Sequence, residues 1–165
     1  MKRLYLVRHA KSSWKNNRLA DIDRPLNGRG KRNLPLMAGR LRDNGAGPSL
    51  IISSPAKRAR KTAKGLARGL GYPKKRISTI ASLYGAGVTT LLDVVTGLED
   101  NLDEVILVGH NPGITDLACL LSGRAIANVP TCGIVALDFV VDSWRQASPA
   151  TAEFLFFDYP KKNVG

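Results

Sequence analysis

The sequence predicts an α/β fold: a three-layer sandwich whose mainly parallel central sheet has helices on both faces and an antiparallel hairpin at one edge. Short apolar runs alternate along the chain with segments whose apolar residues recur at helical spacing, as strands and their connecting helices do. The last two apolar runs follow each other with no helical segment between them, which favours an antiparallel pair. The chain has 165 residues and no internal repeat, so residues 1–165 are expected to form a single domain.

The expected strands are apolar runs bounded by charged or turn-forming residues. They cover residues 4–7, 50–53, 77–80, 105–108, 134–141 and 153–157. Runs that are apolar throughout, such as Leu4-Tyr5-Leu6-Val7, are typical of strands buried on both faces of a sheet. Residues 142–151 are expected to turn the last two strands into the edge hairpin.

The expected helices cover residues 34–44, 55–70, 89–98 and 112–121. In the first, Leu34, Met37, Ala38 and Leu41 follow the i, i+3, i+4, i+7 pattern of one helix face. Pro35 places the start of this helix close by, because proline is tolerated only near the first turn.

The helix expected over 55–70 carries two opposite stripes. The apolar stripe comprises Ala59, Ala63, Leu66, Ala67 and Leu70, and the basic stripe comprises Lys57, Lys61, Lys64 and Arg68. This spacing is typical of an amphipathic helix that packs its apolar side against the sheet. The basic stripe is interpreted first as a solvated face.

Composition limits the classes of function. The formal net charge of +12 would attract phosphate esters, polyanions or acidic protein surfaces. Nucleic-acid binding is not expected, because aromatic residues make up only 6% and no nucleic-acid motif appears. No apolar stretch approaches the ~20 residues of a membrane span, and the first apolar run is too short for a signal peptide, so a cytoplasmic location without membrane attachment is expected.

The two cysteines are not expected to carry chemistry. Cys119 and Cys132 fall in apolar segments, where a free thiol behaves as a small hydrophobic side chain. A disulfide is not expected in the cytoplasm, and two cysteines do not make a metal site.

The chain has only two histidines, and both follow an expected strand. Arg8-His9 comes after the first apolar run, and His110 comes after the run 105–108 and Gly109. Two further junctions, Ser53-Ser54-Pro55 and Asn111-Pro112, offer a capping side chain followed by proline at the first helical position. Because ligands bind at the carboxyl ends of parallel strands, and helix N-termini favour anions, this edge is the predicted site.

The residue types at this edge suit a phosphoryl group. Arg58 lies in the first turn after Pro55, so two guanidinium groups and two imidazoles converge there. Arginine binds two phosphoryl oxygens at once, and a neutral imidazole is available near neutral pH to attack phosphorus. These groups could position and neutralise a phosphoryl group without a metal or other cofactor.

Three motifs resemble those of the histidine phosphatase superfamily, which also contains cofactor-dependent phosphoglycerate mutase. They are Arg8-His9-Ala10, then Ser53-Ser54-Pro55 with Arg58-Ala59 and Thr62-Ala63, and finally Gly109-His110-Asn111. The resemblance implies a phosphoglycerate mutase-like fold, with His9 as the nucleophile and Arg8, Arg58 and His110 as catalytic residues that bind the phosphoryl group of the substrate.

Within the superfamily, the chain looks most like the small phosphohistidine phosphatase branch of the bacterial SixA type. Lys11-Ser12-Ser13-Trp14, Asp23-Arg24-Pro25-Leu26-Asn27 and Arg29-Gly30 are typical of that branch. Trp14 is expected either to pack over the cleft or to bury the loop after the first motif. Asp23 and Arg24 are expected to form a pair that fixes their loop.

Two departures from the larger branches bear on the substrate. Residues 76–92 contain no Asp or Glu to protonate a leaving group, and Trp14 is followed by Lys15 where the mutases have asparagine. A phosphorylated imidazole can leave without an added proton, so the missing acid favours P–N bonds or activated esters. Asp21 or Asp23 could still supply an acid.

The predicted function is hydrolysis of protein phosphohistidine by a monomeric enzyme, on a phosphotransfer domain or carrier. Little sequence remains beyond the α/β core to build a lid, and an open cleft suits a phosphorylated side chain of another protein. The alternative is a phosphatase of small phosphorylated metabolites or activated esters. A non-catalytic phosphate- or polyanion-binding module is a third possibility.

Overall fold

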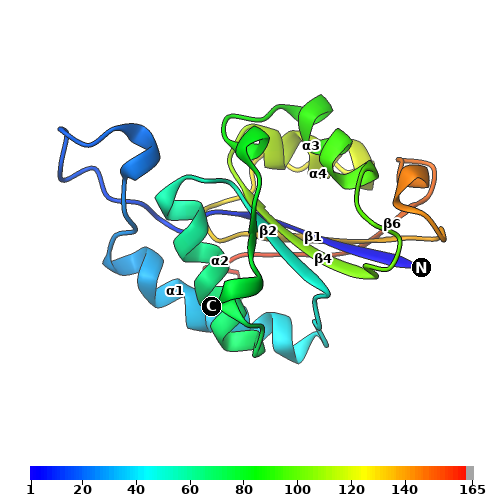
Figure 1. Ribbon diagram of the computed structural model, residues 1–165, viewed down its shortest axis with the longest axis horizontal. Coiled ribbons are helices and arrows are strands. Elements are labelled where there is room, and N and C mark those ends of the chain that lie inside the picture. The colour runs from blue at the N-terminus through cyan, green and yellow to red at the C-terminus, as the bar shows by residue number, and fades with distance from the viewer. Residues whose placement is uncertain (163–165) are drawn as a thin grey trace.

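The computed structural model describes residues 1–162, which form one six-stranded sheet with helices on both sides (Figure 1). The strands are β1 (Lys2–Arg8), β2 (Leu50–Ser53), β3 (Ser78–Thr79), β4 (Glu104–Gly109), β5 (Ile134–Phe139) and β6 (Ala152–Asp158). Their order across the sheet is β3-β2-β4-β1-β5-β6. The first four run parallel, whereas β5 is antiparallel to both β1 and β6. The predicted three-layer α/β fold with an antiparallel edge hairpin is confirmed.

Two helices cover each face of the sheet. The helices are α1 (Gly28–Asp43), α2 (Lys57–Leu70), α3 (Val88–Thr96) and α4 (Gly113–Ser122). Figure 1 shows α1 and α2 on one side and α3 and α4 on the other. Single 3₁₀ turns lie at η1 (Asp21–Asp23), η2 (Lys74–Arg76), η3 (Ala81–Leu83) and η4 (Trp144–Gln146). No helix within residues 1–162 is long and apolar enough to cross a membrane.

The central strand β1 is buried on both faces, as its uninterrupted apolar run predicts. Tyr5 and Val7 belong to the core beneath α1 and α2, and Leu4 and Leu6 to the core beneath α3 and α4. Alternate side chains of a strand point to opposite faces, so a strand with helices on both sides needs apolar residues at every position.

The start of α1 differs from the prediction by six residues. The helix begins at Gly28, where the side chain of Asn27 accepts a hydrogen bond from the Gly30 amide at 2.8 Å. Pro35 therefore lies inside the helix and not in its first turn. The first turn was missed because it contains two glycines and no apolar side chain. Gly30 is needed for packing, since a Cβ there would lie 2.2 Å from the Lys11 carbonyl oxygen.

The proline junctions also differ from the prediction. α2 begins at Lys57, two residues after Pro55, and its N-cap Ala56 makes no side-chain cap. α4 begins at Gly113, so Pro112 is its N-cap and not its first residue. Asn111 does cap this helix, because its Oδ1 accepts from the Thr115 amide at 3.1 Å. Two expected strands, 77–80 and 134–141, are shorter, with β3 reduced to two residues and β5 ending at Phe139.

Strand register sets the position of the site. Arg8 pairs with Gly109, and Ser53 pairs with Val108, so β1, β4 and β2 end side by side. Two further bonds continue this alignment beyond the strands: the His9 amide donates to Gly109, and the Ser54 amide donates to Val108, both at 3.1 Å. Residues that follow the three strands are therefore adjacent at one edge.

Candidate active site

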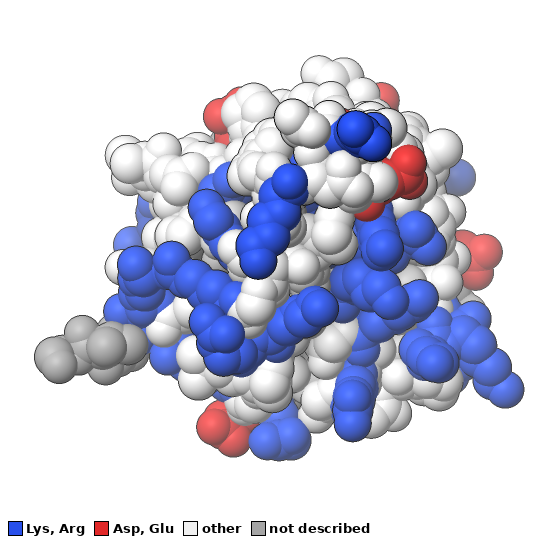
Figure 2. All heavy atoms as spheres, turned by 90° about the vertical axis from the view of Figure 1, so that its left-hand side faces the viewer, with Lys and Arg blue, Asp and Glu red and all other residues white. Residues whose placement is uncertain are grey.

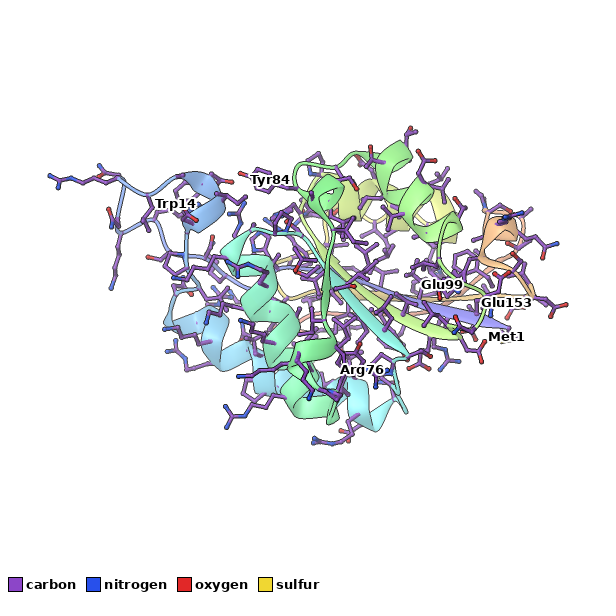
Figure 3. The ribbon with its side chains drawn as sticks, viewed as in Figure 1. Met1, Trp14, Arg76, Tyr84, Glu99 and Glu153 are labelled. Atoms are coloured by element: carbon purple, nitrogen blue, oxygen red, sulfur yellow. The ribbon has the colours of Figure 1, made fainter. Side chains whose placement is uncertain are left out.

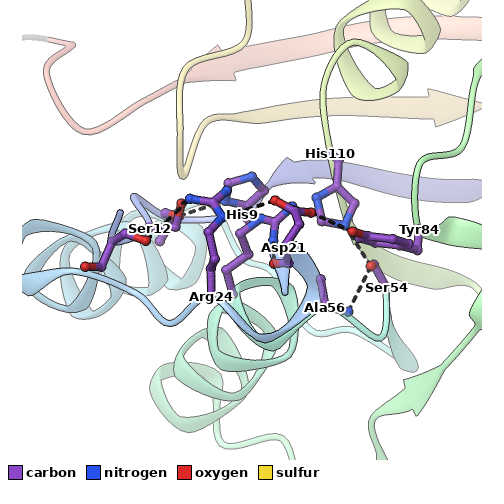
Figure 4. A network of polar contacts seen from close by, with 11 residues as sticks. His9, Ser12, Asp21, Arg24, Ser54, Ala56, Tyr84 and His110 are labelled. Atoms are coloured by element: carbon purple, nitrogen blue, oxygen red, sulfur yellow. Dashed lines mark hydrogen bonds and ion pairs between the residues drawn. The ribbon is translucent and has the colours of Figure 1, made fainter. Parts of the chain in front are cut away.

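The two histidines meet at this edge, as the sequence predicts. The ring centroids of His9 and His110 are 5.2 Å apart, and both side chains are buried. Arg58 is also buried, and Arg8 is half-buried. Arg8 ends β1, Arg58 lies in α2, and His9 and His110 directly follow β1 and β4. Figure 4 shows the polar contacts around the histidines.

The geometry of His9 leaves one ring nitrogen free to react. Its Nδ1 lies 2.8 Å from the Ala10 carbonyl oxygen, which can only accept, so Nδ1 carries the proton and Nε2 keeps its lone pair. Burial lowers the pKa of His9 to about 3, and the positive charges of Arg58 and Arg8 add to this effect. His9 is consequently neutral near pH 7, as a nucleophilic imidazole must be.

A hydroxyl orients His110. Its Nε2 lies 2.7 Å from Ser54 Oγ, which also accepts from the Ala56 amide at 3.2 Å. A serine hydroxyl that accepts from the Ala56 amide still has its own proton to donate, and when it donates that proton to His110 Nε2 the ring proton lies on Nδ1. Burial, and then the charge of Arg58, lower the pKa of His110 to about 4. His110 is then a neutral donor through Nδ1–H.

Three buried donors at this edge lack a hydrogen-bond partner among residues 1–162. They are Arg8 Nε, Arg58 Nε and His110 Nδ1. Buried polar groups are almost always paired, because an unpaired one costs about 1–3 kcal/mol. Three unpaired donors on the residues that surround His9 indicate a binding site for an anion with several acceptor oxygens.

A carboxylate that was not assigned to the site lies against Arg58. Asp21 Oδ2 accepts from Arg58 Nη2 at 3.0 Å and from the Tyr84 hydroxyl at 2.6 Å, while Oδ1 accepts from Arg24 Nε at 3.1 Å. The Tyr84 hydrogen bond, followed by those from Arg58 and Arg24, holds the pKa of Asp21 well below its usual range. Asp21 is therefore ionised.

Tyr84 completes this cluster from another part of the chain. It reaches from the segment before α3 to Asp21 in η1, and its ring packs edge-on against His110 at 5.6 Å between centroids (Figure 4). In the sequence, the stretch 76–92 around Tyr84 stands out only because it contains no Asp or Glu. Nothing in the local sequence pattern indicated that the Tyr84 hydroxyl would lie against Asp21.

Arg24 and Trp14 form a stacked pair beside the site. The Arg24 guanidinium carbon lies 3.4 Å from the centroid of the Trp14 ring, and Arg24 Nη1 donates to Ser12 Oγ at 2.9 Å. The predicted loop-fixing pair is corrected: Arg24 binds Asp21 and not Asp23. Trp14 is 73% exposed, so it does not bury the loop after the first motif.

Thr62 ties the first two motifs together. Its hydroxyl accepts from the Ala10 amide at 2.9 Å and donates to the Arg58 carbonyl at 2.8 Å. The loop after β1 and the first turn of α2 are thereby held at a fixed spacing. The Ala10 to Thr62 link explains why Thr62 belongs to the second motif.

Comparisons with known proteins agree with this geometry. The sequence model of the histidine phosphatase superfamily (branch 1) matches residues 4–83, which include Arg8, His9 and Arg58. An uncharacterized chloroplastic protein of Arabidopsis thaliana is 33% identical over 154 residues, 88% of this chain and 70% of that protein. An uncharacterized protein of Mycobacterium tuberculosis is 32% identical over 165 residues, 94% of this chain and all of that protein.

A solved structure from Agrobacterium tumefaciens, provisionally named phosphohistidine phosphatase SixA, is similar over 96% of this chain and 98% of its own. The two share 28% sequence identity with a TM-score of 0.83. The chain therefore belongs to the histidine phosphatase superfamily, branch 1, and has the phosphoglycerate mutase-like fold. Its activity is that of a phosphatase of this superfamily, which disfavours the non-catalytic binding module.

The lowered pKa values of the two histidines predict an unusual titration. Both rings stay neutral above pH about 4 and gain a proton only as the pH falls through about 4 and 3. An ordinary histidine would titrate near pH 6.5. We expect neither ring to shift in a ¹H–¹⁵N spectrum between pH 7.5 and 5, and kcat/KM, corrected for substrate ionisation, to be flat over that range. In His9→Ala only one histidine ring remains, so its signal identifies His110 in the spectrum. A midpoint above pH 6 for either ring would contradict this prediction.

Proposed function

We propose that this phosphatase hydrolyses phosphohistidine on a protein, through a covalent phosphohistidine intermediate on His9 and without a metal or other cofactor. The observation that carries the proposal is the state of Asp21, which three donors keep ionised beside Arg58. An ionised carboxylate has no proton to give to a departing alkoxide. Because a general acid typically contributes ~10²–10⁴-fold, a site without one favours a leaving group that needs no proton.

In the first step, His9 Nε2 attacks the phosphorus of the substrate, and the bond between phosphorus and the substrate imidazole breaks. The substrate ring leaves neutral when its other nitrogen already carries a proton. Nδ1–H of His9 stays bonded to the Ala10 carbonyl, which stabilises the charge that develops on the ring. Arg8, Arg58 and His110 would bind the phosphoryl oxygens through the donors that lack partners within residues 1–162.

In the second step, water attacks the phosphorus of phospho-His9. The bond to Nε2 breaks, inorganic phosphate leaves, and the neutral ring of His9 is restored. The same two arginines and His110 bind the phosphoryl group in both steps, so the two transfers use one set of contacts.

The surroundings of the site support a protein substrate. Trp14, stacked on Arg24, is 73% exposed, and Tyr84, bonded to Asp21, is 38% exposed. In Figure 3, Trp14 stands out from the body of the molecule on the loop that precedes η1. Exposed aromatic and apolar side chains grouped beside a site are typical of surfaces that contact another protein.

The test compares substrates with enzyme treated with EDTA. We expect turnover of a phosphohistidine-bearing phosphotransfer domain to exceed that of a sugar phosphate or a nucleotide, and to be unaffected by the chelator. Turnover of para-nitrophenyl phosphate reports on the site independently, because its leaving group needs no acid. Faster turnover of a sugar phosphate or a nucleotide than of phosphohistidine would overturn the proposal.

A second candidate, hydrolysis of small phosphate esters, is favoured by the position of Asp21. A phosphoryl group that displaced this half-exposed carboxylate from Arg58 would remove one of the donors that lower its pKa. Asp21 could then take up a proton close to the leaving group.

Asp21→Asn distinguishes the two candidates. Under the phosphohistidine proposal, kcat for phosphohistidine changes less than about tenfold, because no acid is needed. KM for phosphorylated substrates falls, since the carboxylate no longer competes for Arg58. Steady-state kinetics on phosphohistidine and on an alkyl phosphate measure both effects.

Asp23→Asn is the matched control, because Asp23 lies two residues away and is exposed. Asp23→Asn is expected to leave kcat and KM unchanged for both phosphohistidine and the alkyl phosphate. A loss of 10²-fold or more on the alkyl phosphate in Asp21→Asn alone, with phosphohistidine unaffected, would identify Asp21 as a general acid and favour the small-ester function.

A further inference from the structure

A groove runs along the outer side of the helix pair formed by α1 and α2. The two helices approach closely at glycines: a Cβ on Gly65 would lie 2.6 Å from Leu34 Cδ1, and a Cβ on Gly69 would lie 2.3 Å from Ala38 Cβ. Two hollows of about 340 and 600 Å³ follow this seam, and a third of about 490 Å³ lies beside them, between α2 and the segment that follows it. Each pair of hollows has a lining residue in common: Lys61 for the 490 and 340 Å³ hollows, Gly65 for the 490 and 600 Å³ hollows, and Leu34 for the 340 and 600 Å³ hollows. The three are therefore treated as one surface, here called the α1–α2 groove.

The rims of the α1–α2 groove are strongly basic. They carry Lys31, Lys57, Lys61, Lys64, Arg68 and Lys74. None of these six cations takes part in an ion pair within residues 1–162. The two helices hold eleven of the 25 Lys and Arg residues and only one acid, Asp43. Figure 2 looks at the end of the molecule where α1 and α2 begin and shows Lys and Arg gathered there.

The floor of the α1–α2 groove is mainly apolar. Leu34, Pro35 and Gly65 contribute to it, and Pro25 and Leu26 line the end nearest the site. An apolar floor between cationic rims is complementary to an amphipathic protein segment whose apolar side chains are flanked by acids. The sugar–phosphate chain of a nucleic acid would gain little from such a floor, because its contacts are ionic or stack on aromatic rings.

One end of the α1–α2 groove adjoins the catalytic edge. Lys57 directly precedes Arg58, and Pro25 directly follows Arg24. At 1.5 Å per residue, the 14 residues of α2 extend about 21 Å away from that edge. A helix of about that length could therefore lie in the groove while a neighbouring part of the same protein reached His9.

We propose that the α1–α2 groove docks an acidic amphipathic segment of the phosphorylated protein whose phosphohistidine is hydrolysed at His9. The inference rests on the proposed function and extends it, because it assigns the basic face of α2 to substrate recognition. The reacting phosphoryl group is bound by the catalytic edge, and the groove supplies contacts that a small substrate cannot make.

The test separates docking from chemistry with two substrates. One is an acidic phosphotransfer domain phosphorylated on histidine with phosphoramidate, and the other is free phosphohistidine. In the groove variant Lys61→Glu/Arg68→Glu, we expect KM for the phosphorylated domain to rise about tenfold or more, with a weaker dependence on salt. Turnover of free phosphohistidine should stay within twofold, which also shows that the site is folded.

Arg145→Glu/Lys161→Glu is the matched control, because it makes the same change in net charge at exposed positions outside the groove. We expect this variant to change KM for the phosphorylated domain less than twofold. Equal losses in the two variants would mean that overall charge, and not the groove, attracts the substrate, and would overturn the inference.

A binding experiment tests the groove without turnover. The probe is a fluorescent 18-residue amphipathic helix of glutamate and leucine, titrated into wild type and both variants. Loss of binding only in the groove variant supports the inference. Tighter binding of a single-stranded oligonucleotide of equal net charge, lost in the same variant, would overturn it in favour of a nucleic acid. If wild type turned over neither phosphohistidine substrate, the proposed function would fail, and this titration alone would decide the groove.

Discussion

Replacing His9 with alanine is expected to lower kcat/KM for every substrate by about 10⁴–10⁶-fold, close to the rate without enzyme. The reason is that His9 presents a ring nitrogen with a free lone pair among donors suited to a phosphoryl group, whereas the Nε2 of His110 is bonded to Ser54. Without that nitrogen the two-step route is closed, and the remaining arginines can only bind the substrate. Steady-state kinetics with para-nitrophenyl phosphate measure the loss.

A trapping experiment separates the two histidines. Rapid quenching with ³²P-labelled substrate should leave label on wild type in a bond that survives alkali and breaks in acid, as phosphohistidine does. His110→Ala should form the same adduct more slowly, because it loses a donor but not the nucleophile. Label retained by His9→Ala would contradict the assignment of the nucleophile.

Replacing Arg8 with alanine is expected to lower kcat/KM by about 10²–10³-fold, the usual cost of removing one preorganised donor. Arg8 Nη1 is held by the Val129 carbonyl at 3.1 Å, while its buried Nε has no partner within residues 1–162. Burial lowers the pKa of Arg8, but a guanidinium stays charged in proteins. Arg8→Lys should recover only part of the loss, because an ammonium lacks the planar fork.

Arg3 provides the matched control on the same strand. Arg3 donates two hydrogen bonds to buried Asp138, at 2.7 and 3.0 Å. It lies near the start of β1, at the opposite end of the strand from the site. Arg3→Ala is expected to lower the free energy of unfolding by about 1.5–3 kcal/mol and to leave kcat/KM unchanged. Urea denaturation and kinetics on both variants make the comparison. A similar loss of kcat/KM in Arg3→Ala and Arg8→Ala would show that Arg8 acts through stability and not through phosphate binding.

The elements that the sequence pattern predicted well are those whose residues are apolar at each buried position. Strands β1, β2 and β4 fall within two residues of their expected limits at each end. The start of α1 was missed because its first turn, at Gly28 and Gly30, has no apolar pattern. Position 30 must be glycine because the Lys11 carbonyl lies against it, and the local pattern does not reveal this contact between segments.

The candidate site divides in the same way. His9, Arg8, Arg58 and His110 could be placed together because each follows a strand or opens a helix at one edge. The contacts of Asp21 could not be predicted from the sequence, because Arg58 is 37 residues away and Tyr84 is 63 residues away. Ser54 looked like a helix cap, yet its hydroxyl binds His110, 56 residues later.

The sequence by itself therefore determined the fold class and which residues lie together at the candidate site, because hydrophobic periodicity sets the strands and parallel strands end together. Only the tertiary structure decided which groups the two imidazole rings contact, which carboxylate faces Arg58 and where the basic helix face forms a groove. Those properties depend on hydrogen-bond partners and helix contacts far apart in the chain. Local sequence patterns do not reveal these contacts, because the packing of the layers decides which distant residues meet.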